Sequence, residues 1–175
     1  DGMTQERVKF PARELELFLA EAFQTLDVPV EDSRTIASLM VEADLLGYDT
    51  HGSFRLRQYV NRLRDGGNNP NANVHIATER DSTAVVDGDN GMGHLAMGYA
   101  ANLAVDKARS HGSAWIGVRN GNHAGPASLY VNMIAEQDMI GIVGAVGSAN
   151  HVAPFGGLEL LLGTNPLAIS IPAGQ

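Results

Sequence analysis

The feature that most constrains the fold is a change in hydrophobic periodicity near residue 73. Before it, apolar residues recur every three or four positions, which predicts helices over about 15–23, 36–46 and 53–63. The polar, glycine-rich stretch 65–73 predicts a loop. After this loop, short β-type runs alternate with helical segments, as is typical of an α/β arrangement.

The second part of the chain is expected to supply the sheet. Its predicted strands and helices alternate as follows: strands at 83–87, 114–118, 139–146 and 167–171, with helices at about 95–110 and 127–136. The two later strands are strongly apolar, so we expect them to be buried. The sequence therefore predicts an α/β fold in which an N-terminal helical subdomain, residues 1–72, is followed by the first part of a sheet domain flanked by helices, residues 73–175.

Composition narrows the class of protein. The chain has 175 residues and a formal net charge of −8, and such a surface repels phosphate backbones and anionic lipids. Neither a nucleic acid nor a membrane is therefore an expected partner. The absence of cysteine removes thiolate catalysis and iron–sulfur clusters. Neither a signal peptide nor an apolar stretch of bilayer length is visible, so the cytoplasm is the expected location.

One group of candidate site residues lies at the predicted start of the third helix. His51, Arg55 and Tyr59 are spaced four residues apart and would share one face if the helix begins near Gly52 or Ser53. The planar guanidinium fork of arginine matches a carboxylate, so this face suits a small organic acid. An ordinary surface helix, with Ser53 as N-cap and Arg55 in solvent, fits the same spacing.

A second group follows the predicted strand 114–118. The chain there enters a polar loop, 119–125, at the end of a strand where α/β sheets collect ligands. His123 is the best general acid or base in this loop because its ordinary pKa lies close to neutral pH. The alternative is that the His123 ring only forms hydrogen bonds with the backbone of its own loop. Two later loops, 148–157 and 163–166, offer backbone N–H groups to a ligand, or are ordinary turns.

Other kinds of site are less well supported. Gly91, Gly93 and Gly98 follow a predicted strand and open a helix, but their spacing differs from the G-x-G-x-x-G pattern of dinucleotide-binding loops. A plain glycine turn and direct cofactor contact both stay open for this loop. The six histidines are scattered without metal-ligand spacing, so no metal is expected. No G-x-S-x-G elbow is present, which argues against a serine hydrolase.

Four ordered segments resemble the motifs of one family. Residues 43–55 resemble its A-D-x-x-G-x-x-S-H-G-x-x-R signature, with Thr50 where serine is usual, and 120–125 resemble its N-S-x-H-x-G loop. Residues 153–157 and 162–168 resemble its P-W/F-G-G and G-T-N-P stretches. The family is the malate/L-lactate dehydrogenase type of NAD(P)-dependent oxidoreductase, which lacks a standard Rossmann domain. It includes ureidoglycolate and sulfolactate dehydrogenases and reductases of cyclic imino acids.

The resemblance implies hydride transfer between NAD or NADP and a small 2-hydroxy or 2-oxo acid, in a homodimer. By position it implies two catalytic histidines: His123 is the proton donor and acceptor, and His51 faces the substrate and helps to orient it. The other implied site residues are Arg55, Tyr59 and Thr164 toward the carboxylic acid substrate, and Ser148, Asn122 and Asn165 toward the cofactor.

Family members are about twice as long as this chain, so the resemblance also implies that residues 1–175 form an N-terminal half. The nicotinamide pocket would then be completed by residues that follow. Three other interpretations stay open at this point. They are an NADPH-dependent reductase of cyclic imino acids, a Rossmann-type NADP-binding reductase built on Gly88 to Gly98, and a non-catalytic fragment.

Overall fold

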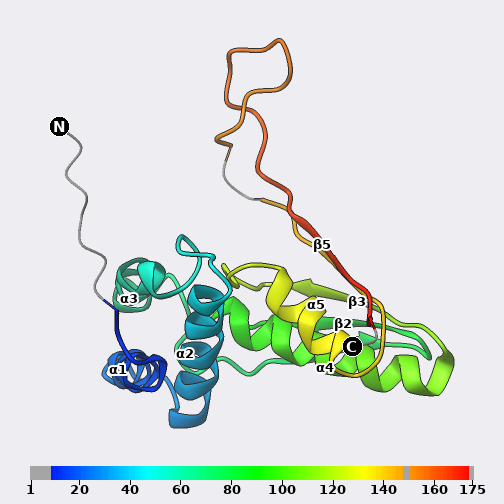
Figure 1. Cartoon of the computed structure of the whole chain (residues 1–175), viewed down its shortest axis with the longest axis horizontal. Coiled ribbons are helices and arrows are strands. Elements are labelled where there is room, and N and C mark those ends of the chain that lie inside the picture. The colour runs from blue at the N-terminus through cyan, green and yellow to red at the C-terminus, as the bar shows by residue number, and fades with distance from the viewer. Residues whose placement is uncertain (1–8, 148–149, 174–175) are drawn as a thin grey trace. The chain divides into compact units, whose positions relative to one another are not determined.

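The computed structural model describes residues 9–147 and 150–173. The chain forms two compact units, Asp1–Asn71 and Ala72–Gln175. Figure 1 shows the elements of both units, which run in the order α1 (Ala12–Gln24), α2 (Val30–Leu45), η1 (Ser53–Arg55), α3 (Leu56–Arg64), β1 (His75–Glu79), β2 (Thr83–Asp87), α4 (Gly93–His111), β3 (Trp115–Arg119), α5 (Ser128–Ala135), β4 (Gly141–Gly144) and β5 (Leu167–Ser170).

The first unit is a small helical assembly. Pro11 and Pro29 stand just before α1 and α2, where their fixed φ suits a helix start and their missing N–H costs nothing. Gly47, with φ of +84°, follows α2 in a left-handed conformation that glycine adopts without strain. The helices enclose a core of large apolar side chains: Leu19, Phe23, Ile36, Met40 and Tyr59.

The second unit contains a three-stranded sheet in the order β1-β2-β3. Strands β2 and β3 are parallel and are joined through α4, whereas β1 is antiparallel to β2. The sheet register shifts between Ile76 and Thr78, so β1 carries a bulge. Its alternation is broken there, which is why β1 is not among the predicted strands. Ala84 and Val86 of β2 are buried, as are several small residues of α4, so the core lies between strand and helix.

The strands β4 and β5 form a separate two-stranded antiparallel ribbon. The Ser170 hydroxyl donates to the Val131 carbonyl at 2.6 Å, which ties the ribbon to α5. The prediction that these strands are buried is wrong: Ile142 is 62% exposed and Ile169 57%. A two-stranded ribbon packed against one helix leaves its other face open, because no third strand or second helix covers it within the described residues.

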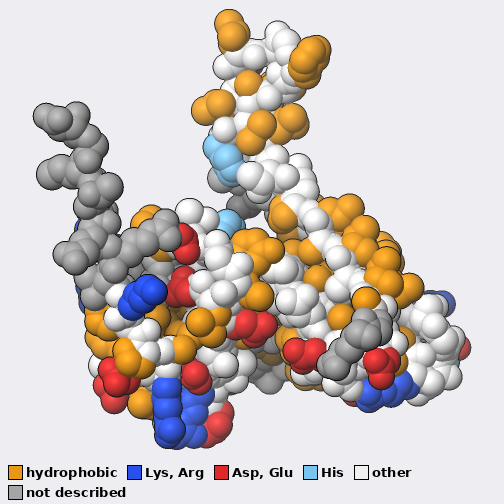
Figure 2. All heavy atoms as spheres, in the orientation of Figure 1, with side chains coloured by type: hydrophobic (Ala, Val, Ile, Leu, Met, Phe, Trp, Pro, Cys, Tyr) orange, Lys and Arg blue, Asp and Glu red, His pale blue; other side chains and the backbone are white. Residues whose placement is uncertain are grey.

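The segment between β4 and β5 is also rich in exposed apolar side chains. Phe155 and Leu158 are fully exposed, and several leucines beside them are largely so. Figure 2 shows hydrophobic side chains on the surface of this segment, which Figure 1 draws in orange. The predicted α/β class with N-terminal helices is confirmed. Among the described residues, no helix has both the length and the apolar character that crossing a bilayer requires.

Candidate functional site

In the first unit, the turn before α3 brings His51 and Arg55 together. The Arg55 side chain folds back so that Nε donates to the Thr50 carbonyl at 2.6 Å, and Nη1 donates to Gln58 Oε1 at 2.8 Å. Thr50 Oγ1 lies 2.8 Å from His51 Nδ1. Burial of the ring, and then the positive charge of Arg55, lower the pKa of His51. The arrangement therefore favours a neutral imidazole next to a fixed guanidinium.

Asp44 holds this turn in place, a role that sequence reasoning missed. Its Oδ2 accepts a hydrogen bond from the Ser53 backbone N–H at 3.0 Å. A Cβ on Gly52 would overlap the same carboxylate, so only glycine lets the turn approach α2 so closely. The signal for this role was the fixed order of Asp44, Gly52 and Arg55 in the family signature.

Tyr59 is buried, whereas Arg55 lines an open depression at the surface. Tyr59 is 1% exposed and belongs to the core of the first unit, and burial raises the pKa of its hydroxyl. Gly52, rather than Ser53, occupies the N-cap position of η1. An open depression beside η1 and α3 is lined by polar and cationic side chains together with one aromatic ring: Phe54, Arg55, Arg57, Gln58, Asn61 and Arg62. Its three guanidinium groups make it suited to an anion.

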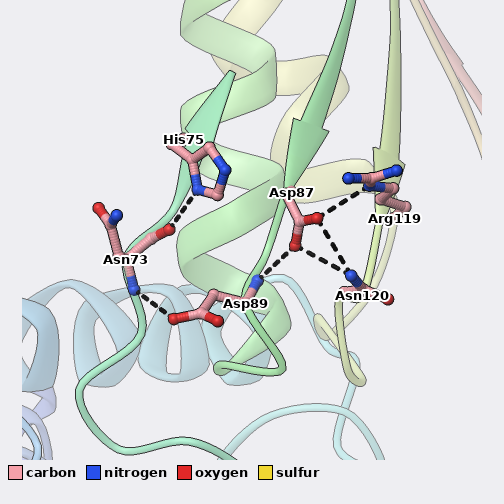
Figure 3. A network of polar contacts seen from close by, with 6 residues as sticks. All are labelled: Asn73, His75, Asp87, Asp89, Arg119 and Asn120. Carbon is pink, nitrogen blue, oxygen red and sulfur yellow. Dashed lines mark hydrogen bonds and ion pairs between the residues drawn. The ribbon is translucent and has the colours of Figure 1, made fainter. Parts of the chain in front are cut away.

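In the second unit, Asp87 organises the ends of two parallel strands. It is the last residue of β2, is buried, and accepts hydrogen bonds from Arg119 Nε at 2.8 Å and from Asn120 Nδ2 at 3.1 Å (Figure 3). The backbone N–H of Asp89 donates to the same carboxylate at 2.9 Å. These hydrogen bonds, above all those from Asp89 and Asn120, lower the pKa of Asp87. A carboxylate thus fixes the start of both loops that follow β2 and β3.

A second set of contacts joins these two loops directly. The Asn122 side-chain amide donates to the backbone carbonyls of Asn90 at 3.0 Å and Gly91 at 2.9 Å. Asp89, Asn90 and Asn120 adopt positive φ, a conformation that Asn and Asp tolerate better than most residues. A Cβ on Gly93 would overlap the Asn122 carbonyl oxygen, so the loop backbone already occupies this space. The structure therefore gives Gly93 a packing role and leaves no room there for a phosphate.

His123 lies in this braced loop and is half-buried. The Gly125 backbone N–H is 3.4 Å from its Nδ1, and the Tyr130 hydroxyl donates to the neighbouring Ala124 carbonyl. His94, in the first turn of α4, is fully buried. Burial, and then the charge of His123, lower the pKa of His94 to about 3. The loop therefore presents the half-buried imidazole of His123, whereas the buried His94 of α4 stays neutral near pH 7.

The remaining predicted site residues belong to the segment between β4 and β5. Thr164 is exposed, and Asn165 accepts a hydrogen bond on Oδ1 from the Gly147 backbone N–H at 2.8 Å. A Cβ on Gly163 would fall 2.5 Å from the Gly147 carbonyl oxygen, so the two sides of the segment approach closely at its base. Ser148 lies outside the described residues.

The structure thus assembles two groups, one in each unit. His51 and Arg55 are neighbours in the first unit, whereas Asn122 and His123 share a braced loop in the second. No group of three or more His, Asp or Glu side chains within reach of one metal ion occurs among residues 9–147 and 150–173.

Comparison with known proteins defines the class. Residues 10–175 match the family model for malate/L-lactate dehydrogenase, and the chain therefore belongs to that family.

Its similar relatives are dehydrogenases. It is 41% identical over 165 residues to the malate dehydrogenase of Pyrococcus abyssi, covering 94% of this chain and 45% of that protein. It is 40% identical to the L-sulfolactate dehydrogenase of Methanocaldococcus jannaschii, covering 94% and 47%. The solved malate dehydrogenase of Pyrococcus horikoshii superposes with a TM-score of 0.91 at 38% identity, over 96% of this chain and 48% of that one. The chain therefore spans about half the length of the curated relatives it matches.

Proposed function

We propose that this chain is part of an NAD- or NADP-dependent oxidoreductase that interconverts a small 2-hydroxy acid and its 2-oxo acid. The observation that carries the proposal is the placement of His123. It stands at the carboxyl end of a parallel strand, in a loop braced by Asp87 and Asn122, where an imidazole can exchange a proton with a bound ligand. The dehydrogenase names of the relatives support the reaction class.

In this proposal the chain's own residues hold the acid and move the proton. Arg55 holds the substrate carboxylate through its guanidinium, and His51 orients the bound acid from beside it. His123 accepts the proton of the substrate hydroxyl when the acid is oxidised and returns a proton to the carbonyl oxygen when it is reduced. A bound nicotinamide would supply the hydride acceptor or donor.

The donors of the second unit fit such a cofactor. Arg119 keeps 61% of its side chain exposed although its Nε is held by Asp87, so its outer nitrogens can meet a phosphate. Thr164 offers a hydroxyl and Asn165 an amide suited to ribose and carboxamide groups, whereas Asn122, whose amide donates to Asn90 and Gly91, would serve the cofactor by holding the loop. We infer that Ser148 adds to this set and that residues beyond 175 complete the pocket, because the relatives are about twice as long.

We also propose a homodimer working in the cytoplasm. The open apolar face of the β4–β5 ribbon supports an assembly in which further protein covers it. The cytoplasmic location is supported by the cofactor requirement, because nicotinamide cofactors are held inside the cell.

A second candidate is reduction of a cyclic imino acid. The solved Δ1-piperideine-2-carboxylate reductase of Pseudomonas syringae pv. tomato superposes with a TM-score of 0.85 at 28% identity. A 2-hydroxy acid is favoured as the substrate because the malate and sulfolactate dehydrogenases are more similar to this chain in sequence than that reductase is.

The test is a substrate panel with the full-length protein. Pyruvate, oxaloacetate, sulfopyruvate and a cyclic imino acid are each offered with NADH and with NADPH. For the preferred acid, Arg55→Lys should raise KM roughly 10- to 100-fold because lysine cannot form the bidentate contact. Arg64→Lys, in the last turn of α3 outside the depression, is the matched control and should change KM little.

The proton-transfer role is tested with His123→Asn. Loss of a general acid–base should lower kcat roughly 10²- to 10⁴-fold with a smaller effect on KM. Undiminished turnover in this variant would refute the assignment of His123, and an unchanged KM in Arg55→Lys would refute the carboxylate contact.

A further inference from the structure

The depression beside η1 and α3 is larger than a single carboxylate needs. Its volume is about 620 Å³, which lies within the range of small-molecule pockets. The proposed function places one carboxylate there, on the guanidinium of Arg55. Apart from the Phe54 ring, all the side chains that line the depression are polar or cationic. The depression therefore has room and hydrogen-bond donors for a further polar group of the bound acid.

The segment that forms this depression is strongly basic, although the chain as a whole is acidic. Four of the 12 lysines and arginines lie within residues 55–64, and no Asp or Glu occurs between Asp49 and Asp65. The formal net charge of the chain is −8, so this concentration of positive charge is local. A concave site lined by one sign of charge attracts ligands of the opposite sign. The depression is therefore suited to an acid with more than one negative charge.

Arg57 and Arg62 bring two further guanidinium groups to the depression, and both residues are exposed. Within residues 9–147 and 150–173, the arginines that form ion pairs are all on other elements: Arg34, Arg109 and Arg119. Arg55, by contrast, already donates from Nε and Nη1 to groups of the protein. Its remaining N–H groups suffice for one carboxylate, so a second acidic group would be bound by Arg57 and Arg62.

Helix periodicity places these guanidinium groups around one ligand. Arg62 follows Arg55 by seven residues, or about two helical turns, and so lies on the same side of α3. By the same periodicity Arg57 lies on the other side of the depression, with Gln58 and Asn61 between. Arginine has a long side chain, and its planar fork matches an acidic group that offers two oxygens. An acid held by Arg55 at one end can therefore meet Arg57 and Arg62 at the other.

We propose that the substrate is a 2-hydroxy or 2-oxo acid with a second acidic group, which Arg57 and Arg62 bind while Arg55 binds the first carboxylate. This inference rests on the proposed function and makes Arg57 and Arg62 specificity-determining residues. The second group is a carboxylate or a sulfonate, because both present the pair of oxygens that the guanidinium fork matches. An acid with a single carboxylate would leave both arginines without a ligand group.

The first experiment measures the substrate selectivity of the full-length protein. Oxaloacetate carries the second group as a carboxylate and sulfopyruvate carries it as a sulfonate, whereas pyruvate lacks it. The ratio of kcat/KM for each dianion to kcat/KM for pyruvate should fall roughly 10- to 100-fold in the double variant Arg57→Gln/Arg62→Gln, because hydrogen bonds between charged groups are lost. Arg64→Gln removes a guanidinium from the same helix outside the depression. This matched control should leave the ratio unchanged.

A binding measurement separates this inference from the proposed reaction. Succinate has two carboxylates and no hydroxyl or carbonyl group to react, and butyrate has a similar length with one carboxylate. In calorimetric titrations of the full-length protein at constant ionic strength, succinate should bind more tightly than butyrate. The double variant should lose most of that difference, and Arg64→Gln should keep it. If His123→Asn keeps its turnover, the proposed proton transfer fails while these titrations still test the two arginines.

Three results would overturn the proposal. One is a wild-type protein that prefers pyruvate to both dianions. Another is a double variant with the same dianion-to-pyruvate ratio as the wild type. The third is an equal loss of succinate and butyrate binding in the double variant, which would show that the two arginines only raise the general positive potential of the surface.

Discussion

Individual side chains in this protein act mainly by holding backbone turns. Asp44 receives the Ser53 N–H and so fixes the turn that carries His51 and Arg55. Asp87 receives donors from both loops that follow β2 and β3. Each carboxylate supports residues that are expected to meet a ligand. Asp44 does so through one backbone N–H and Asp87 through several hydrogen bonds, which restrict the loops beside them.

Asp87→Asn should destabilise the second unit. Asparagine replaces one acceptor oxygen with an NH₂ group that would face the donors of Arg119 and Asn120. Because folding lowers the pKa of Asp87, its ionised carboxylate stabilises the folded state. This stabilisation is complete above the unfolded-state pKa of about 3.8. It is lost as the pH falls through the lower pKa of the folded state.

The check is denaturant unfolding of the full-length protein between pH 3 and pH 8. The midpoint of Asp87→Asn should lie below that of the wild type at pH 7, and the gap should narrow below about pH 4. A gap that stays constant down to pH 3 would show that the ionised carboxylate is not the source of the stabilisation.

Among the elements, α4 does the most to position the second group of site residues. It packs on β2 and β3 and begins against the backbone of the 120–125 loop. Its glycines have unequal roles, because Gly93 faces the loop whereas the Cβ position of Gly98 is open. The sequence therefore predicted the helix and the glycines near its start. Only the packing shows that Gly93, and not Gly98, must be glycine for the loop to lie against the helix.

Gly93→Ala should displace the His123 loop. The new methyl group overlaps the Asn122 carbonyl, so we expect a destabilisation of about 1–3 kcal/mol and a fall in kcat. Gly98→Ala, in the same helix, should be neutral or stabilise by about 0.5–1 kcal/mol, since alanine is the better helix former.

The two variants are compared by thermal unfolding, by kcat and by titration with the cofactor. If Gly93→Ala keeps its kcat but binds the cofactor much more weakly, the glycine loop would instead be a Rossmann-type phosphate-binding loop.

At the scale of the whole molecule, the β4–β5 ribbon and the segment that joins its strands carry a large exposed apolar surface. Ile140, Leu167 and Ile171 are largely exposed, in addition to the residues of the connecting segment. Patches of this kind mark interaction surfaces or aggregation sites. Together with the half-length match to the relatives, this supports the proposal that further protein covers the ribbon.

Residues 1–175 expressed alone should therefore bind a hydrophobic dye and self-associate. The full-length protein should do so much less, because its additional residues bury the ribbon. In the short chain, Phe155→Asp with Leu158→Asp should reduce association without changing the far-UV circular dichroism, since both side chains are exposed. Sedimentation velocity and dye fluorescence provide the measurement, and a monodisperse chain that binds no dye would contradict the expectation.

Local signals in the sequence determined the helices, the α/β class and the loops that carry His51, Arg55 and His123. They did so because periodicity, proline and glycine positions, and strand-to-loop transitions act over a few residues. The tertiary structure alone decided the rest. Asp87 reaches a loop that is distant in sequence, the backbone of another loop occupies the space beside Gly93, and the ribbon stays uncovered. These features depend on which segments come together in space, and no local pattern encodes that.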